Sequence, residues 1–341
     1  MRRRRLAYVW ALVMLLTLSP ATAAAKPGTS WAQAELETVV AAGIMAKAAA
    51  ARPDSPLTQG ELESIVAGLT QTEAATPPSP AAKVTMAALD ARLVAALGLT
   101  DSAKLFTQSA RTAGLAPPSR FGTEAVARLL GLRINHPAAL DAIELSPGQP
   151  ATHAEAAYSA ARMLQLGEAD TQGVQELAAS FVLPALTSWQ KKVLKTAVRF
   201  IGYPYVWGGT SENAEAPFGV QAPGGFDCSG FVWRVFKLQV YPGGSALAGT
   251  LKGRTTFAMS GEVPAAKRIP FARLKPGDLL FWGAAGPRSK PAQVDHTGIY
   301  LGNGWFIHSS GYGVALAQLS GWYKQRFAWG RRPLAEAGLG T

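Results

Sequence analysis

The chain has 341 residues, with 33 Lys and Arg against 22 Asp and Glu and a single cysteine. One cysteine excludes a disulfide-stapled miniprotein and a structural zinc site made of four thiolates. Hydrophobic residues make up 48% of the chain, which excludes a disordered acidic protein. At about 150 residues per domain, the length predicts two domains, each large enough to bury its own core.

The first 25 residues have the pattern of a secretory signal peptide. Residues 2–5 are arginines, residues 6–18 are uncharged and apolar, and residues 20–23 are small and suit a cleavage site. The apolar stretch is too short for a bilayer span, which needs about 20 residues. We therefore favour cleavage near Ala23 or Ala25 over an uncleaved anchor, and expect an exported protein with no integral membrane span after cleavage.

Positive charge is concentrated in the second half of the chain. Residues 26–189 contain 11 basic and 15 acidic side chains, whereas residues 190–341 contain 18 and 7. A basic surface of this kind attracts polyanions. For an exported protein we expect that polyanion to be the cell wall, with its phosphates and carboxylates, and not nucleic acid.

Residues 26–187 are predicted to form an all-α region, because apolar residues recur there every three or four positions. Thr58 and Thr152 are each followed three residues later by a glutamate, which is the spacing of a helix capping box. We predict a helix at each position and a third at a degenerate copy, residues 121–124. The proline-containing residues 72–82 are predicted to be an exposed linker.

These segments, together with the earlier stretch around Trp31, resemble S-layer homology repeats. That resemblance implies docking on an anionic secondary cell-wall polymer. Such repeats usually carry an arginine after the capping threonine, where this chain has Gln59 and His153. Because capping boxes are common to helices in general, a helical spacer or packing domain without a ligand is the alternative interpretation.

The second half opens with a predicted helix from Ser188 to about Ile201, followed by an aromatic, glycine-closed turn at 203–209. After a polar loop, helical apolar spacing places Cys228 in the first turn of a helix. A helix N-terminus favours the thiolate, so we expect a lowered pKa for Cys228 and a role as nucleophile. The alternative is that Cys228 is a small buried hydrophobic residue.

The second half also contains three apolar segments predicted to be strands, at 279–282, 295–301 and 305–308. The last two are joined by a hairpin at 302–304. Antiparallel pairing brings His296 and His308 to one end of the sheet, where a cysteine, a base and a base-orienting group can converge. A single strand histidine is more often structural, but two beside a cysteine favour catalysis. None of the four histidines lies in an H-E-x-x-H arrangement, so we expect no metal and no cofactor.

Four motifs within residues 188–333 resemble the NlpC (p-sixty) cell-wall cysteine peptidases. In chain order they are Y-V-W-G-G, F-D-C-S-G-F, L-K-P-G-D-L-L-F-W and D-H-T-G-I-Y-L-G-N-G-W-F-I-H. The resemblance implies a papain-like α+β fold, with helices packed on an antiparallel sheet. It also implies that Cys228 is the nucleophile, His296 the base, His308 the residue that orients the base, and Tyr205 the active-site tyrosine beside the cysteine.

The same resemblance implies a substrate, the peptidoglycan stem peptide, cut at the γ-D-glutamyl to diaminopimelate bond. The residues themselves indicate only acyl transfer at an amide or ester. Asp227 and Ser229 match positions that help bind the amino end of the stem peptide, and Trp207 is assigned to substrate binding. One departure from the family pattern is the long insertion at 210–224, which leaves the shape of the substrate groove open.

The sequence thus predicts a signal peptide at 1–25, a helical region at 26–187, a peptidase domain at 188–333 and a tail at 334–341. We expect a secreted, cell-wall-associated endopeptidase. Two other functions stay open: a non-catalytic wall-binding protein, and an amidase or acyltransferase on the same Cys-His scaffold.

Overall fold

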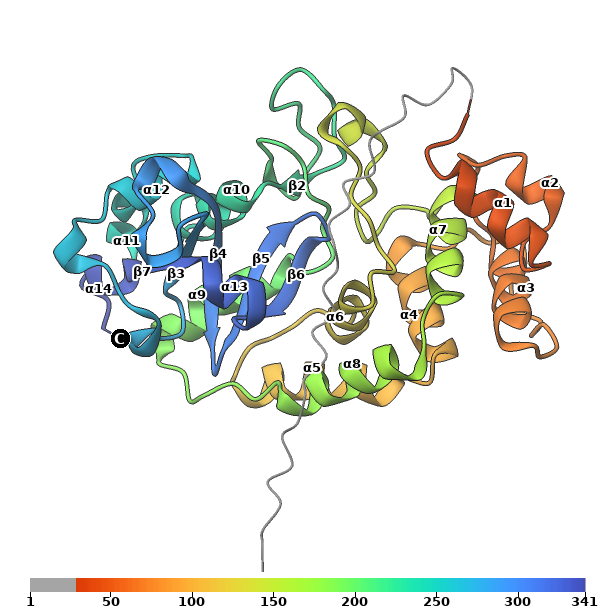
Figure 1. Cartoon of the computed structure of the whole chain (residues 1–341), viewed down its shortest axis with the longest axis horizontal. Helices are drawn as coiled ribbons and strands as arrows, with labels where there is room; N and C mark the ends of the chain where they lie inside the picture. The colour runs from red at the N-terminus through yellow and green to blue at the C-terminus, as the bar shows by residue number, and fades with distance from the viewer. Residues whose placement is uncertain (1–28, 341) are drawn as a thin grey trace, which may run out of the picture.

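A computed structural model of the protein describes residues 29–340 (Figure 1). The predicted signal peptide, residues 1–25, falls within residues 1–28, which lie outside the described residues. Between residues 29 and 340, none of the helices has the length and hydrophobicity of a bilayer-spanning segment.

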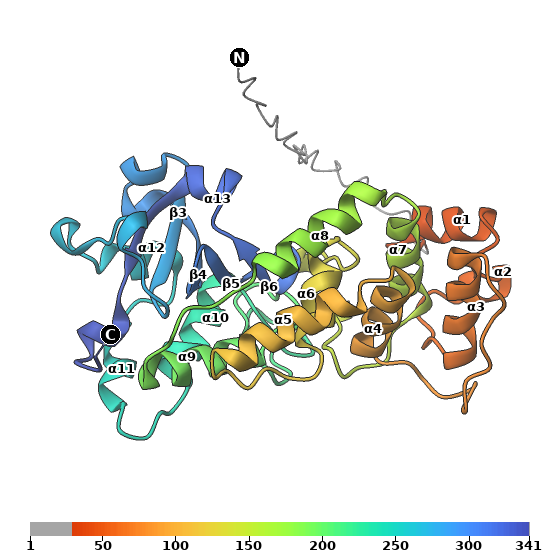
Figure 2. The same ribbon diagram turned by 90° about the horizontal axis from the view of Figure 1, so that it is seen from below.

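The first half is helical, and Figure 1 shows it beside the sheet-containing half. Its helices are α1 (Gln33–Ala41), α2 (Lys47–Ala50), α3 (Gln59–Thr70), α4 (Met86–Ala96), α5 (Thr100–Thr112), α6 (Phe121–Leu129), α7 (His153–Met163) and α8 (Glu168–Ser180), with a short 3-10 helix at Ala138–Ile143. Helices α5 and α8 pack against each other along the molecule, as Figure 2 shows. The residues between α3 and α4 are mostly exposed, as predicted for 72–82.

Three extended segments of the helical region pair in a closed ring. The amide of Leu57 donates to the carbonyl of Ala151 at 2.7 Å, the amide of Val84 to Leu57 at 2.9 Å, and the amide of Ala151 to Val84 at 2.8 Å. Each segment leads into a helix whose first turn is capped by a threonine hydroxyl: Thr58 for α3, Thr85 for α4 and Thr152 for α7. The ring fixes the starting points of these three helices relative to one another.

The predicted helix starts at Thr58 and Thr152 are confirmed, but the third copy is not built like them. Of α3, α4 and α7, only α3 has the complete capping box; at α7, Glu155 turns away and binds Arg133 at 3.1 Å. Helix α6 does begin at Phe121, but Thr123 lies inside its first turn and donates to the carbonyl of Arg120. The third helix of this kind is α4, which is capped by Thr85. Thr85 is not followed by a glutamate three residues later, so it lacks the capping-box pattern in the sequence.

The second half is built on an antiparallel five-stranded sheet with strand order β6-β5-β4-β3-β7. Its strands are β3 (Leu279–Gly283), β4 (Val294–Gly302), β5 (Trp305–Ser310), β6 (Gly313–Gln318) and β7 (Phe327–Arg331). Its helices are α9 (Ser188–Arg199), α10 (Cys228–Trp233), α11 (Ser245–Thr250), α12 (Thr256–Gly261), α13 (Gly321–Arg326) and α14 (Pro333–Glu336). A two-stranded ribbon pairs β1 (Thr210–Ser211) with β2 (Gly225–Phe226). The predicted α+β class and the three predicted strands, which are β3, β4 and β5, are confirmed.

The hydrophobic core runs without interruption from the helical region into the sheet. Trp305 of β5 packs edge-on against Phe106 of α5 and Phe181, with ring centroids 5.8 and 5.0 Å apart. Large aromatic rings contribute much of the apolar area that stabilises such contacts. The helical region is therefore packed onto the sheet as one body, and it can influence the residues of the sheet.

Candidate active site

Cys228 is the first residue of α10, in the helix turn where it was predicted. Asp227 caps the helix, and its carboxylate accepts a hydrogen bond from the amide of Gly230. The cysteine side chain is buried, and the backbone amides of Thr297 and Ser229 hydrogen-bond to its sulfur. Because Thr297 follows His296 in β4, the thiol lies beside the peptide that joins these two residues.

The expectation that the helix N-terminus lowers the pKa of Cys228 is wrong. Burial of the thiol raises its pKa to about 12, and the carboxylate of Asp227 adds to this effect. The amides of Thr297 and Ser229 and the charge of Arg254 favour the thiolate but do not outweigh burial. The resting side chain is a neutral thiol, so it needs a base to become a nucleophile.

The two predicted histidines meet at one end of the sheet, as expected. β4 and β5 are antiparallel neighbours, and Nε2 of His296 lies 2.7 Å from Nδ1 of His308. The imidazole of His308 is buried, and that of His296 is partly buried. Burial lowers the pKa of His296 to about 4, and burial together with the neighbouring His296 lowers the pKa of His308 well below its ordinary value. Both rings are therefore neutral near pH 7, and one donates a hydrogen bond to the other.

Aromatic rings surround this histidine pair. The ring of Trp282 lies 5.3 Å from that of His296, and the rings of Phe306 and Tyr323 lie 4.9 and 5.4 Å from that of His308. Such an apolar enclosure disfavours an imidazolium, which explains the direction of both pKa shifts. It also holds the two rings in fixed orientations.

A cavity of about 440 Å³ opens over Cys228. It is lined by all the residues predicted to act beside the cysteine, namely Tyr205, Trp207, Asp227 and Ser229. Burial, with the nearby Cys228 and Asp227, raises the pKa of Tyr205, so its hydroxyl stays protonated and can donate. Neither histidine lines this cavity; His308 instead lines a separate cavity of about 380 Å³.

Arg254 is a site residue that the sequence did not indicate. Its guanidinium donates to both carboxylate oxygens of Asp227 at 3.2 Å and to the hydroxyl of Ser229 at 2.6 Å. It also donates to the carbonyl of Gly208 at 3.0 Å. Arg254 lies in a loop before α12 that matches no motif, so only the folded chain reveals that it compensates the charge of Asp227.

The insertion at 210–224 folds back on itself and forms one wall of the cavity. The carboxylate of Glu215 accepts from the amide of Ser211 at 3.1 Å, and both oxygens of Glu212 bind Arg234 at 2.8 Å. Phe218 lies against Gly208, where a Cβ atom would collide with its ring. The insertion therefore narrows the space over the cysteine.

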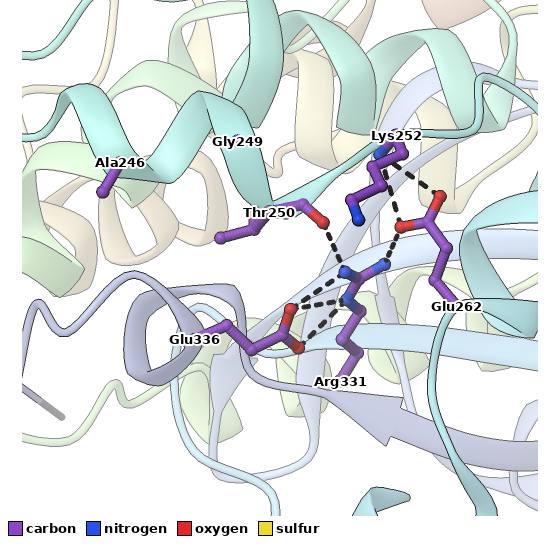
Figure 3. A pocket seen from close by; sticks show the side chains of 7 residues that line it. All are labelled: Ala246, Gly249, Thr250, Lys252, Glu262, Arg331 and Glu336. Carbon is purple, nitrogen blue, oxygen red and sulfur yellow. Dashed lines mark hydrogen bonds and ion pairs between the residues drawn. The ribbon is translucent and has the colours of Figure 1, made fainter.

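A separate depression of about 580 Å³ lies between β7, α11 and α14 (Figure 3). Arg331 occupies its floor and binds Glu262 at 2.8 Å and Glu336 at 2.9 Å. It also donates to the carbonyls of Thr250 and Met259, so every donor of the guanidinium is used within the protein. This cluster ties the elements together and leaves Arg331 no donor for a ligand. Over residues 29–340, no group of His, Cys, Asp and Glu is arranged to hold a metal ion.

Residues 202–332 match the NlpC/P60 family. Among curated relatives, the chain is 32% identical over 142 residues to the probable peptidoglycan endopeptidase LytE of Bacillus subtilis, covering 41% of this chain and 34% of the relative. It is 32% identical over 128 residues to the gamma-D-glutamyl-L-lysine dipeptidyl-peptidase of Bacillus subtilis, covering 38% and 34%. It is 34% identical over 144 residues to the murein DD-endopeptidase MepH of Escherichia coli, covering 42% and 45%.

The chain spans between a third and just under half of the length of these relatives. A solved NlpC/P60 family protein from Bacillus cereus is 25% identical, with a TM-score of 0.33, and the match covers 46% of this chain and 43% of that one. The chain thus contains an NlpC/P60 domain at 202–332. The S-layer homology predicted for the helical region is not supported, since the family match leaves residues 26–187 outside it.

Proposed function

We propose that this chain, whose residues 202–332 form an NlpC/P60 domain, is a cysteine peptidase that hydrolyses amide bonds in peptidoglycan stem peptides. One observation carries the proposal: the buried thiol of Cys228 lies beside the His296–Thr297 peptide, and His296 is paired with His308 at 2.7 Å. The matched relatives are named as peptidases, two of them by their cell-wall substrate, which supports the substrate class.

In the proposed mechanism, the Nε2–H group of His296 donates a hydrogen bond to Nδ1 of His308, so the lone pair on Nδ1 of His296 is free to act as the base. That nitrogen takes the thiol proton while the sulfur of Cys228 attacks the substrate carbonyl. The imidazolium then protonates the leaving amine, and water activated by His296 releases the acyl group from the sulfur. Because both resting groups are neutral, proton transfer accompanies attack instead of preceding it.

The negative charge that develops on the carbonyl oxygen needs donors already in place. We assign this role to a backbone amide in the first turn of α10 and to the hydroxyl of Tyr205, which lines the cavity over Cys228. The raised pKa of Tyr205 suits the assignment, because the phenol keeps its proton at the pH of the reaction. Removing one donor of this kind costs about 10² to 10³ in kcat.

For substrate binding we propose Asp227, Ser229 and Trp207, which line the cavity together. Asp227 and Ser229 would receive the amino end of the stem peptide, and Arg254 would hold them in position. The ring of Trp207 is 56% exposed and offers an apolar face at the cavity. We further propose that the bond cut is the γ-D-glutamyl to diaminopimelate bond.

We also propose that the protein is secreted and acts at the cell wall, after removal of residues 1–25. Residues 188–333 would form the peptidase domain, residues 334–341 a tail and residues 26–187 a helical region, and the protein would contact anionic secondary cell-wall polymer. The excess of basic residues after 190 would add electrostatic attraction to the wall. Sedimentation of the full-length protein with purified wall, with and without its secondary polymer, tests the polymer contact; equal sedimentation would contradict it.

The function is tested by incubating purified peptidoglycan with the wild-type protein and with Cys228→Ala, followed by mass spectrometry of the released fragments. We expect release by the wild type only, insensitive to chelators and blocked by thiol alkylation. The fragment masses identify the bond and separate an endopeptidase from an amidase or acyltransferase. Equal release by both proteins would contradict the hypothesis that Cys228 catalyses hydrolysis. Retention of substrate without release would favour a wall-binding protein.

A further inference from the structure

Side chains of the helical region hold the backbone of the turn that carries Tyr205. Arg128 of α6 donates to the carbonyl of Gly202 at 2.6 Å, and the side-chain amide of Asn135 donates to the carbonyl of Tyr205 at 3.2 Å. The carboxylate of Asp141 accepts from the amide of Trp207 at 2.9 Å. All three residues lie outside the NlpC/P60 match at 202–332, yet each bonds to the main chain within six residues of its start.

The groups that make these three contacts are buried or partly buried. Arg128 is buried, pairs with Glu124 at 3.3 Å and donates to the carbonyl of Tyr312 as well. Arg120 adds two bonds at the beginning of the same turn, to the carbonyls of Arg199 at 2.7 Å and Ile201 at 3.0 Å. Hydrogen bonds to charged groups contribute about 1.5–3 kcal/mol each, so together they restrain the turn strongly.

The buried position of Asp141 is not explained by hydrogen bonds between its side chain and the helical region. It is only 4% exposed, and its second oxygen has no hydrogen-bond partner within the described part of the chain. A buried acceptor left without a donor costs about 1–3 kcal/mol. Its carboxylate also interacts electrostatically with the hydroxyl of Tyr205, one of the groups around Cys228. We therefore attribute the buried position of Asp141 to the hydrogen bond that it accepts from the amide of Trp207.

We propose that Asp141 and Asn135 are positioning residues of the active site, which hold the Tyr205–Trp207 backbone so that the Tyr205 hydroxyl stays beside Cys228. The helical region is then a structural part of the catalytic centre and more than a spacer. The kinetic test of this inference rests on the proposed peptidase function. A misplacement of about 1 Å in such a group can lower the rate 10²-fold.

The test uses the full chain with Asp141→Ala, Asp141→Asn and Asn135→Ala, and with Arg92→Ala as a matched control. Arg92 pairs with Glu63 at 2.7 Å on α3 and α4, so its removal perturbs the helical region without touching the turn. Three quantities are measured: kcat and KM on an isolated stem peptide, the Tm, and the rate of iodoacetamide alkylation of Cys228. Since Cys228 is the only cysteine, alkylation reports on the site without requiring turnover.

For Asp141→Ala we expect kcat to fall about tenfold to 10²-fold with little change in KM, and the alkylation rate to change severalfold. Asn135→Ala should act in the same direction with a smaller effect. Asp141→Asn keeps an acceptor for the Trp207 amide and should stay within about threefold of wild type. Arg92→Ala should lower only the Tm.

Two results would overturn the inference. One is wild-type kcat and alkylation in Asp141→Ala. The other is equal loss in Asp141→Asn and Asp141→Ala, which would mean that the charge of Asp141 acts on the substrate instead of its hydrogen bond acting on the turn. Should the wild-type protein release no peptide at all, the proposed function fails, but the alkylation rates still decide whether Asp141 positions the site.

Discussion

The helical region and the NlpC/P60 domain both bury ionisable side chains, but the partners of those side chains differ. In the helical region, Arg133 lies between Glu155 at 3.1 Å and Asp90 at 3.7 Å, and all three side chains are buried. At the histidine end of the NlpC/P60 sheet, the groups are the thiol of Cys228 and the imidazoles of His296 and His308, which loss of solvent contact keeps neutral. In the first arrangement a guanidinium has carboxyl groups as partners, whereas in the second the partners are a thiol and imidazoles.

This difference distinguishes side chains that stabilise the packing from side chains that are able to react. A buried ion pair fixes the relative position of its elements, because removing one partner leaves an uncompensated charge. A neutral thiol and a neutral imidazole leave no uncompensated charge at rest, and the thiol proton moves to the imidazole only as the sulfur attacks a substrate carbonyl. The contrast thus favours the histidine end of the sheet as the reactive end, and substitutions can test it.

The largest effect is expected for His296→Ala. If the imidazole is the base, kcat on a stem peptide should fall by about 10³-fold or more, since a thiol whose pKa is about 12 cannot ionise unaided near pH 7. His153→Gln is the matched control, because His153 is buried but contacts Glu61 in the helical region at 3.2 Å. Activity in His296→Ala close to wild type, measured by chromatography of the products, would show that the neutral pair is structural.

His308 should contribute less, because it acts through His296. His308→Ala is expected to lower kcat by about 10²-fold, and His308→Asn, which can still accept from Nε2 of His296, by about tenfold. Both variants should leave KM nearly unchanged. Equal losses in the two variants would mean that an acceptor at position 308 is not what orients the base.

The pH dependence follows from the lowered histidine pKa values. With a pKa of about 4, His296 is a free base above that pH, so kcat should be flat from about pH 5 to 8 and fall as the pH drops toward 4. The unfolded chain binds protons on its histidines at about pH 6.5, before the folded chain does, so stability should also decline as the pH falls from about 6.5 to 4. A rate profile with its acid limb near 6.5 would contradict this assignment.

Local pattern predicted much of this fold, but not its long-range contacts. The strands on either side of Gly302–Gly304 and the start of α10 follow from apolar spacing and turn residues, and these predictions were correct. The pKa of Cys228 was predicted in the wrong direction, because the helix end is visible in the sequence whereas the burial of the sulfur is not. Arg254 and Asp141 reach the site from distant segments and belong to no motif, so nothing local could have indicated them.

The smallest expected effect concerns Asp90 in the helical region. Burial raises its pKa to about 7, so the folded chain binds a proton there that the unfolded chain has already lost above about pH 4. Stability should therefore fall as the pH rises from about 4 to 7 on account of this group, opposite in sign to the histidines.

Asp90→Asn removes this dependence, because its side chain is neutral at every pH. Thermal unfolding should give equal Tm values for variant and wild type at pH 4. At pH 8 the variant should have the higher Tm, because it does not have to bury a carboxylate. Asp101→Asn, at an exposed position on α5, is the control and should change neither value by more than a fraction of this difference. A lower Tm for Asp90→Asn at pH 8 would mean that Asp90 is ionised and compensates Arg133. The helical region would then be held together by a complete ion network, and the contrast with the neutral catalytic end would be sharper still.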